Sequence, residues 1–457
     1  MTAKKLSRRN FLKTASLAIG SSAVLAACAP AGAPTASDSS GDTMDEPAMD
    51  EVTLTFGMTW GAAFQGRQIE FNEQFTERHP NIQTDVTFNT WGDHNKVVPT
   101  WAAGGELPDI IYVHGSRAFP WAFEGMFISL DEFIDASPEF DIDGVWEEAL
   151  RLYRQNGIQY GIPYDHGPLI LGYNKDLFDA AGMDYPTAEW TMDDLRETAI
   201  ALTDTEAAVP QWGWRGNLPQ LGNTGYGLTV GPWGGEMWNE DETELLLNND
   251  TSIAAIQWWT DLIHADGAAP TPADSEAFEG GAWMAGRIAM SSVASWNTPS
   301  LAEFAPFSWD VAPWPKGPDG RRETNSFGSG FSITTNSAHP NEGWVYMSEY
   351  LNKEGMEFMW GSTGRGSPAR EAAYDSWINS EPAPENAEYF LEALSNYAIT
   401  GSPFQTLAAA EANDIHSREM GLVRSGDKPV AEAVAAIVDE TNPVLAEAAE
   451  RFKAGSS

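Results

Sequence analysis

The sequence predicts an α/β protein built from two large lobes or domains, and three observations support this prediction. The chain has 457 residues, which is more than one ordinary hydrophobic core organises. Hydrophobic residues make up 42% of it, which indicates a packed globular body and not a disordered chain. Strand-like and helix-like patterns alternate at the start of that body, and this order implies a mostly parallel sheet with helices on both faces.

The body begins at about residue 51 with this alternation. Apolar residues take every second position over residues 52–58, which is the period of a strand. A helical stretch over about 65–78 follows, and a His-Pro pair stops it. Residues 82–88 alternate again, and the short apolar run 107–113 suits a buried strand.

Ligands of parallel sheets bind at the carboxyl ends of the strands. In this sequence those ends carry Trp60-Gly61, Trp91-Gly92 and the run from His114 to Arg117. We therefore expect this edge of the sheet to form part of a binding site.

Helices are also expected later in the body. Thr191 has the character of an N-cap, with Asp194 three residues later as an aspartate variant of the capping box. Trp259 shares a helix face with three isoleucines and is expected in the core. Amphipathic or Ala-rich patterns predict two further helices, over 341–351 and about 430–452.

The first fifty residues carry signals for export and anchoring. Arg8 and Arg9 lie in a complete twin-arginine export pattern. A short apolar run then ends in Leu-Ala-Ala-Cys, which resembles a bacterial lipobox and marks Cys28 for lipidation. The run is too short for a stable transmembrane helix, and residues 29–50 read as a flexible linker. The alternative is an ordinary N-terminal helix with a chance cysteine.

The chain is strongly acidic, with a formal net charge of −40. Such a surface repels nucleic acid and anionic lipid headgroups, so no nucleic-acid partner is expected. Solubility or adaptation to a salty medium is the favoured explanation of the charge, which does not identify a ligand.

Tryptophan gives the clearest indication of a ligand, because the chain has 19 of them. A flat indole face suits the apolar face of a sugar ring, and neighbouring carboxylates and amides such as Asp165, Glu236 and Asn297 can bond sugar hydroxyls. The tryptophans beside Gly, Pro or Asn in apparent loops are Trp60, Trp91, Trp212, Trp214, Trp233, Trp296, Trp314 and Trp360. Each of these has the alternative of packing beneath its loop. The tryptophans assigned to the core outright are Trp146, Trp190, Trp258, Trp259, Trp344 and Trp377.

Motifs for catalysis and metal binding are missing from the sequence. The seven His form no His-Glu-x-x-His motif, and neither a Gly-x-Ser-x-Gly elbow nor a Gly-x-x-x-x-Gly-Lys phosphate loop occurs. We expect no catalytic residue, no metal and no cofactor. A glycoside hydrolase needs only two carboxylates, so 66 Asp and Glu leave that alternative open.

Several short motifs occur along the body. Tyr-Gly-Ile-Pro at 160–163 precedes Leu-Gly-Tyr-Asn-Lys-Asp-Leu-Phe at 171–178. Leu-Pro-Asp-Ile-Ile at 107–111, Trp-Gly-Gly-Glu at 233–236 and Gly-Ser-Gly-Phe at 328–331 accompany them. With this set, the body from about residue 52 to 450 resembles extracellular solute-binding protein family 1, the group of maltose-binding and multiple-sugar-binding proteins.

The resemblance implies a two-lobed periplasmic-binding-protein fold of class II type. Each lobe is then a mostly parallel sheet flanked by helices, and hinge crossovers join the lobes. The implied division is a signal peptide at 1–27, a lipid-anchored linker at 28–50, an N-terminal lobe at 51–167 plus 326–377, and a C-terminal lobe at 168–325 plus 378–457.

The resemblance also implies a set of ligand contacts. The first lobe would supply Trp60, Trp91, His114, Arg117 and Arg365, with Tyr164 and Asp165 at the hinge. The second lobe would supply Trp212, Trp214, Tyr226, Trp233, Glu236, Trp296 and Phe404.

The implied function is the substrate-binding component of an ABC importer that captures a mono- or oligosaccharide and delivers it to the transmembrane permease subunits. The protein would be a monomer and not an enzyme, exported by the twin-arginine route and held by its lipid at the cell membrane, facing the periplasm or the exterior. A receptor for glycerol phosphates or peptides is one alternative. A secreted glycoside hydrolase or a lectin is another.

Overall fold

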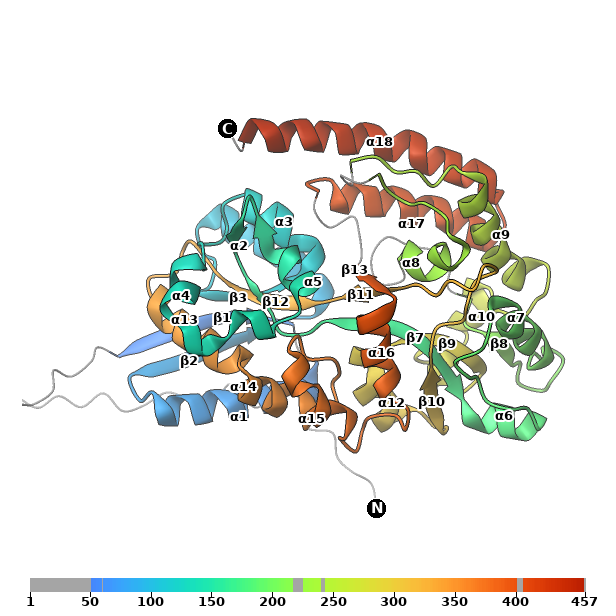
Figure 1. Cartoon of the computed structure of the whole chain (residues 1–457), viewed down its shortest axis with the longest axis horizontal. Coiled ribbons are helices and arrows are strands. Elements are labelled where there is room, and N and C mark those ends of the chain that lie inside the picture. The colour runs from blue at the N-terminus through green and yellow to red at the C-terminus, as the bar shows by residue number, and fades with distance from the viewer. Residues whose placement is uncertain (1–50, 60, 217–224, 240–242, 401–405, 456–457) are drawn as a thin grey trace, which may run out of the picture. The chain divides into compact units, whose positions relative to one another are not determined.

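The computed structural model describes residues 51–59, 61–216, 225–239, 243–400 and 406–455. These residues fall within one compact unit and form two lobes, each with its own sheet and flanking helices (Figure 1). The export signal, Cys28 and the linker lie outside the described residues.

The first lobe is built on a five-stranded sheet of order β2-β1-β3-β12-β6. Strand β1 (Val52–Met58) runs parallel to β2 (Ile82–Phe88) and β3 (Ile110–His114). Strand β12 (Ser329–Ile333) runs antiparallel to both β3 and β6 (Ile162–Pro163). A separate hairpin joins β4 (Arg154–Gln155) and β5 (Ile158–Gln159). The helices of this lobe are α1 (Ala62–Arg78), α2 (Trp91–Gly104), α3 (Gly115–Phe123), α4 (Asp131–Ala136), α5 (Glu147–Leu150), α13 (Pro340–Leu351) and α14 (Lys353–Met356).

The second lobe is built on a six-stranded sheet of order β13-β11-β7-β9-β8, with β10 also paired to β7. Its strands are β7 (Gly167–Asn174), β8 (Trp212–Trp214), β9 (Ile288–Ala294), β10 (Trp309–Ala312), β11 (Thr324–Phe327) and β13 (Ala398–Thr400). Its helices are α6 (Lys175–Ala181), α7 (Met192–Ala201), α8 (Tyr226–Thr229), α9 (Asp250–His264), α10 (Pro272–Glu276), α11 (Gly281–Met284), α12 (Thr298–Phe304), α16 (Glu388–Asn396), α17 (Ala409–Ser425) and α18 (Val430–Gly455). Between the lobes, α15 (Tyr374–Ile378) packs on the π-helical turn 357–361 and buries Trp377 among residues of the second lobe.

The two sheets are mixed, and not mostly parallel as the sequence suggested. The parallel β1, β2 and β3 agree with the predicted β-α-β-α-β order. In the second lobe, however, β7 runs antiparallel to β9, β10 and β11. An alternating order of strands and helices favours parallel neighbours only where a helical crossover joins the two strands. Strands that enter a sheet directly from the other lobe, such as β7 and β12, are not bound by it.

Two direct strand-to-strand connections form the hinge. Residues 164–166 link β6 to β7, and Gly328 alone links β11 to β12. The connections are hydrogen-bonded to each other, since the Tyr164 N–H donates to the Ser329 carbonyl at 2.9 Å. At Gly328 a Cβ atom would lie 2.3 Å from the carbonyl oxygen of Asp165, so the two crossings can approach this closely only where one residue has no side chain.

A third segment runs beside these crossings. The His166 N–H donates to the Ser367 carbonyl at 3.1 Å, and the Ala369 N–H donates to the Tyr164 carbonyl at 3.0 Å. The lobes are thus joined by three adjacent stretches of backbone that lie side by side at one place.

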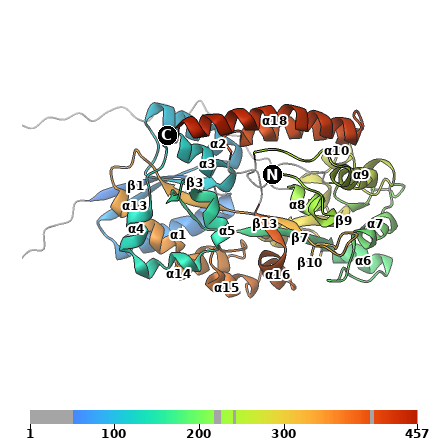
Figure 2. The same cartoon turned by 45° about the horizontal axis from the view of Figure 1, so that its top comes forward.

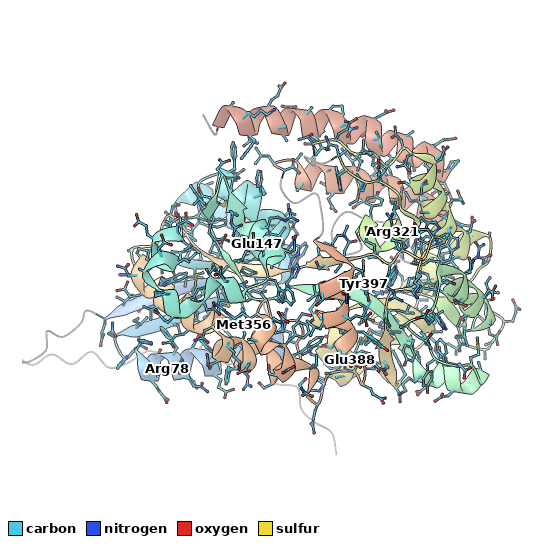
Figure 3. The ribbon with its side chains drawn as sticks, in the orientation of Figure 1. Arg78, Glu147, Arg321, Met356, Glu388 and Tyr397 are labelled. Atoms are coloured by element: carbon cyan, nitrogen blue, oxygen red, sulfur yellow. The ribbon has the colours of Figure 1, made fainter. Side chains whose placement is uncertain are left out.

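Each lobe has buried apolar side chains, and Met356 of α14, labelled in Figure 3, is one of those in the first lobe. Five tryptophans pack together in the second lobe: Trp214, Trp233, Trp258, Trp259 and Trp314. The Trp259 and Trp314 indole N–H groups donate to backbone carbonyls at 2.9 and 2.8 Å, which lets these rings lie in the interior with their polar atom satisfied. Much of the tryptophan content is therefore structural.

The C-terminal helix α18 runs along the molecule from the second lobe to α3 of the first (Figures 1 and 2). Within the described ranges, no helix is long and apolar enough to cross a membrane. Nor do the described side chains include a group of three or more His, Cys, Asp or Glu that could hold a metal ion.

Candidate ligand-binding site

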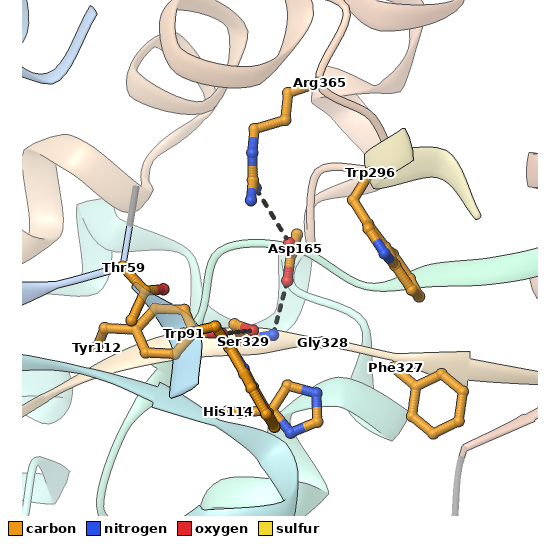
Figure 4. A pocket seen from close by; sticks show the side chains of 10 residues that line it. All are labelled: Thr59, Trp91, Tyr112, His114, Asp165, Trp296, Phe327, Gly328, Ser329 and Arg365. Carbon is orange, nitrogen blue, oxygen red and sulfur yellow. Dashed lines mark hydrogen bonds and ion pairs between the residues drawn. The ribbon is translucent and has the colours of Figure 1, made fainter. Parts of the chain in front are cut away.

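A pocket of about 190 Å³ lies where the two lobes meet at the hinge. Figure 4 shows the side chains around it. Its lining residues are Thr59, Trp91, Tyr112, His114, Asp165, Trp296, Phe327, Gly328, Ser329 and Arg365.

Two tryptophans from different lobes face this pocket. Trp91 is the first residue of α2, after the N-cap Thr90, and its side chain is 50% exposed. Trp296 follows directly from β9 in the short turn 295–297 and packs edge-on against Phe327 at 6.4 Å between ring centroids. An exposed large aromatic side chain at a pocket wall offers a flat apolar face to a ligand.

His114 lies at the end of β3 and begins α3 as its N-cap. Its Nδ1 is 2.8 Å from the Ser116 hydroxyl, and its ring lies edge-on to Trp91 at 6.2 Å. Burial, together with the nearby positive charge of Arg117, lowers the pKa of His114 to about 4. The imidazole is therefore neutral at pH 7 and can take part in hydrogen bonds without adding charge.

Asp165 is part of the first crossing between the lobes. Its Oδ1 accepts a hydrogen bond from the Ser329 N–H at 2.6 Å, and its side chain is 15% exposed. Burial raises the pKa of Asp165 to about 7, although the Arg365 guanidinium and the Ser329 N–H both act to lower it. The carboxyl group is therefore divided between its two protonation states near neutral pH.

Arg365 approaches the pocket from the loop between two glycines with positive φ, Gly364 at 65° and Gly366 at 118°. Its guanidinium lies 4.8 Å from the ring centroid of Phe64 and 4.9 Å from that of Trp360. Its Nη1 is 3.6 Å from Oδ2 of Asp165. The aromatic contacts fix the position of this cation, and the partly ionised Asp165 offsets part of its positive charge.

Hydroxyl groups complete the lining. The Tyr112 hydroxyl lies 2.9 Å from the Ser329 hydroxyl, and Thr59 follows β1 at the same edge of the sheet. The sequence did not single out Thr59, Tyr112, Phe327 or Ser329. The last of these lies in the Gly-Ser-Gly-Phe motif at 328–331, which contributed to the family resemblance.

The arrangement can bind a small polar ligand with apolar faces. Among the described residues that line the pocket, Asp165 is the one carboxylate and Arg365 the one Arg or Lys. Aromatic walls with a few converging polar groups are typical of small-molecule sites. Hydrolysis of a glycosidic bond uses a pair of carboxylates, and the described lining supplies one.

Five of the predicted contacts line this one pocket: Trp91, His114, Asp165, Trp296 and Arg365. Two more lie close behind it. Tyr164 is buried at the hinge and stacks on Trp360 at 4.7 Å, and Arg117 lies on α3 beyond His114.

Three predicted contacts lie in the protein interior and not at the pocket. Trp212, Trp214 and Tyr226 are 5%, 1% and 1% exposed. Trp214 packs against Trp259, and the Tyr226 hydroxyl is 2.8 Å from Nδ1 of His416. The sequence placed them at the cleft because short buried strands and turns look like loops when they contain Gly and Trp.

The remaining predicted contacts are also away from the pocket or outside the described residues. Trp233 is partly buried against Trp258, and the Glu236 side chain is exposed to solvent. Trp60 and Phe404 lie outside the described residues. Trp314 and Trp360, which the sequence placed in loops, are buried.

Comparison with known families gives one match over most of the body. The model of the family described as bacterial extracellular solute-binding protein matches residues 60–357. An arabinooligosaccharide-binding protein of Halalkalibacterium halodurans is 24% identical over 357 residues, which cover 75% of this chain and 76% of that protein. An uncharacterised lipoprotein of Streptomyces antibioticus is 23% identical over 323 residues, 68% of this chain and 69% of its own.

Solved structures share the fold. An ABC substrate-binding protein of Listeria monocytogenes, in complex with cycloalternan, superposes with a TM-score of 0.79 at 25% identity, and the match covers 87% of this chain and 100% of that one.

Proposed function

This chain belongs to the bacterial extracellular solute-binding proteins, and from that premise we propose that it is the substrate-binding component of an ABC importer, with a mono- or oligosaccharide as its ligand. The ligand is held between the two lobes at the hinge pocket and is passed to the transmembrane permease subunits. Members of the family are binding proteins, and we propose that this chain performs no catalysis.

The observation that carries the proposal is the pair of indole rings, Trp91 and Trp296, which reach one pocket from different lobes. A sugar ring has apolar C–H faces and a rim of hydroxyls. The rings suit the faces, while Asp165, Arg365 and Ser329 suit the hydroxyls. The ligands named for two of the similar proteins, arabinooligosaccharide and cycloalternan, are carbohydrates.

The hinge supplies the mechanism. A ligand that touches Trp91 in one lobe and Trp296 in the other makes its full set of contacts only when both walls are close. Its binding therefore shifts the population toward the closed arrangement. Because three adjacent backbone stretches join the lobes, closure is a bending motion at residues 164–166 and Gly328.

The charge balance of the pocket argues against the main alternatives. A glycerol phosphate usually requires several Arg side chains or free N–H groups, whereas Arg365 is already paired with Asp165. A peptide receptor commonly adds a strand or binds the peptide termini by charge. The aromatic lining, with a single guanidinium facing a partly ionised carboxyl group, favours an uncharged polyol over both.

The location of the protein is part of the proposal. Arg8 and Arg9 direct twin-arginine export, and lipidated Cys28 holds the protein at the membrane through the linker 29–50. The similar lipoprotein of Streptomyces supports an anchored protein of this kind. We propose that it acts as a monomer, with the lobe division predicted from the sequence.

A thermal-shift screen tests the ligand class. The panel contains arabino- and malto-oligosaccharides, cycloalternan, their monosaccharides, glycerol 3-phosphate and short peptides. A sugar present at ~100 times its Kd should raise stability by about 2.7 kcal/mol. A shift caused by glycerol 3-phosphate or a peptide, with none from any sugar, would refute the carbohydrate assignment. Release of reducing ends from the bound sugar would refute the absence of catalysis.

A further inference from the structure

The end of α18 makes a contact between the lobes that is separate from the hinge. The helix is anchored in the second lobe by two hydrogen bonds between Asn442 and Leu245. The Leu245 N–H donates to Oδ1 of Asn442 at 2.8 Å. Nδ2 of Asn442 donates to the Leu245 carbonyl at 3.3 Å. Arg418 of α17 is paired with Glu440 at 2.6 Å. These contacts fix the middle of α18 to the second lobe.

The C-terminal turns of the same helix reach α3 of the first lobe. The ring of Phe452 lies 5.0 Å from that of Phe119 and 5.6 Å from that of Phe123, measured between centroids. The Arg451 guanidinium lies 5.6 Å from the Phe123 ring. Both phenylalanine partners belong to α3, so the contact is with one helix of the other lobe.

Burial along α18 continues toward this contact. Leu445, Ala448 and Phe452 lie on one helix face, because they are spaced by three and four residues. Leu445 and Ala448 are buried, and they belong to the same continuous apolar cluster as Ala118 and Ala122 of α3. The cluster therefore extends from one lobe to the other.

A second helix of the second lobe also acts on α3. Burial lowers the pKa of Arg117, and the negative charge of Asp414 on α17 partly offsets this effect. Arg117 lies three residues after His114, which lines the pocket and begins α3. The helix that receives α18 is thus the helix that carries one wall of the pocket.

We propose that the C-terminal turns of α18, residues 445–452, are a strap that holds the two lobes together away from the hinge. The strap is fixed in the second lobe and attached to α3 by the side chain of Phe452. It keeps the wall that carries Trp91 and His114 at its described distance from Trp296. Opening of the lobes beyond the described arrangement requires Phe452 to leave the two rings of α3.

The test measures the distance between the lobes in the empty protein, so its result does not depend on which sugar binds. Spin labels are attached at Glu132→Cys on α4 and Asp193→Cys on α7, both exposed positions, in the full chain carrying Cys28→Ala. The labelled chain with Phe452 unchanged should give one narrow distribution of the distance between the two labels. Phe452→Ala should add a population at longer distance.

The expected size follows from the contact that is lost. An aromatic pair is worth about 0.5–1.5 kcal/mol, which corresponds to a roughly 2- to 12-fold rise in the ratio of separated to held molecules. Phe123→Ala should have a similar effect from the other lobe. The double variant should add little to Phe452→Ala, since that variant already lacks the contact between Phe452 and Phe123.

Leu422→Ala is the matched control, because Leu422 is an apolar residue of α17 that is 37% exposed. It should leave the distribution unchanged, and Phe452→Leu should restore part of the held population. Near-ultraviolet circular dichroism verifies that each variant is folded, and Phe123→Ala replaces Phe452→Ala if the latter is not. A distribution that is unchanged in the folded variants, or already as broad in the wild type, overturns the strap.

Discussion

Asp165 combines three roles at a single position: it belongs to the hinge, it lines the pocket and it pairs with Arg365. Its pKa of about 7 results mainly from burial. The unfolded chain has an aspartate pKa of about 3.9. Between these two values the folded protein binds more protons than the unfolded chain, so the stability that this group contributes falls as the pH rises from about 4 to about 7.

The Asp165→Asn variant should remove this dependence. Between pH 5 and pH 8 the wild type should lose on the order of 2 kcal/mol of unfolding free energy relative to Asp165→Asn, measured by urea denaturation at both pH values. The exposed Asp143→Asn is the control and should follow the wild type. Equal losses in the wild type and Asp165→Asn would show that the carboxyl group does not titrate in this interval.

The tryptophans should divide into two kinds when they are truncated. Trp91→Ala and Trp296→Ala should raise the Kd for a bound sugar by five- to more than a hundredfold, which corresponds to about 1–3 kcal/mol, and should hardly move the Tm of the empty protein. Trp214→Ala, which is 1% exposed in the wild type, should lower the stability by roughly 3–5 kcal/mol. Calorimetric titration and melting curves measure the two effects. Unchanged affinity in both pocket variants would remove the indole rings from the site.

The sequence predicted only part of the set of residues that line the pocket. It selected Trp91, His114, Asp165, Trp296 and Arg365, which line one pocket. It could not separate these from Trp212, Trp214 and Tyr226, because burial depends on packing partners far away in the chain. Tyr112 was read only as part of a strand, since its contact with Ser329 requires the pairing of β3 with β12. That assignment of residues to a binding site stays a prediction until ligand contacts are measured.

Among the elements, the hinge strands impose the tightest steric requirement. A methyl group on residue 328 would overlap the carbonyl of Asp165. Gly328→Ala should therefore destabilise the protein by about 1–3 kcal/mol, the usual cost of overpacking, when followed by denaturant unfolding. Gly66→Ala is the matched control, because Gly66 is an exposed position of α1 with nothing within 4 Å of an added Cβ, and it should stabilise by up to ~1 kcal/mol. Equal stability of the two variants would mean that the crossings separate freely.

The elements were predicted more completely than the site. Strands β1 and β2 occupy the residues given by the apolar alternation, and α1 ends at Arg78, just before the His-Pro pair. The capping box at Thr191 is confirmed, since its N–H donates to Asp194 Oδ2 at 2.8 Å and its hydroxyl accepts from the Asp194 N–H at 3.2 Å. These features follow from local spacing. The direction of β7 and β12 does not follow from local spacing, because it depends on how the chain crosses from one lobe into the other.

For the whole molecule, the proposed membrane attachment depends on residues before the folded body. Cys28→Ala should move the protein from the membrane fraction to the soluble fraction. Arg8→Lys together with Arg9→Lys should leave the precursor in the cytoplasm, because the twin-arginine pattern is lost. Cell fractionation followed by immunoblotting measures both. Membrane retention of Cys28→Ala would contradict the lipid anchor, and normal export of the double lysine variant would contradict the route.

The pairing of β3 with β12 has a consequence during synthesis of the protein. His114 lies opposite Ser329, so translation of the segment between them takes roughly 10–40 s at ~5–20 residues per second. During that interval the exposed edge of β3 has no partner, and the first lobe cannot close its sheet on the ribosome. An unpaired strand edge invites association with other chains. The order in which the ribosome delivers the strands therefore makes the nascent first lobe a natural client for a holding chaperone.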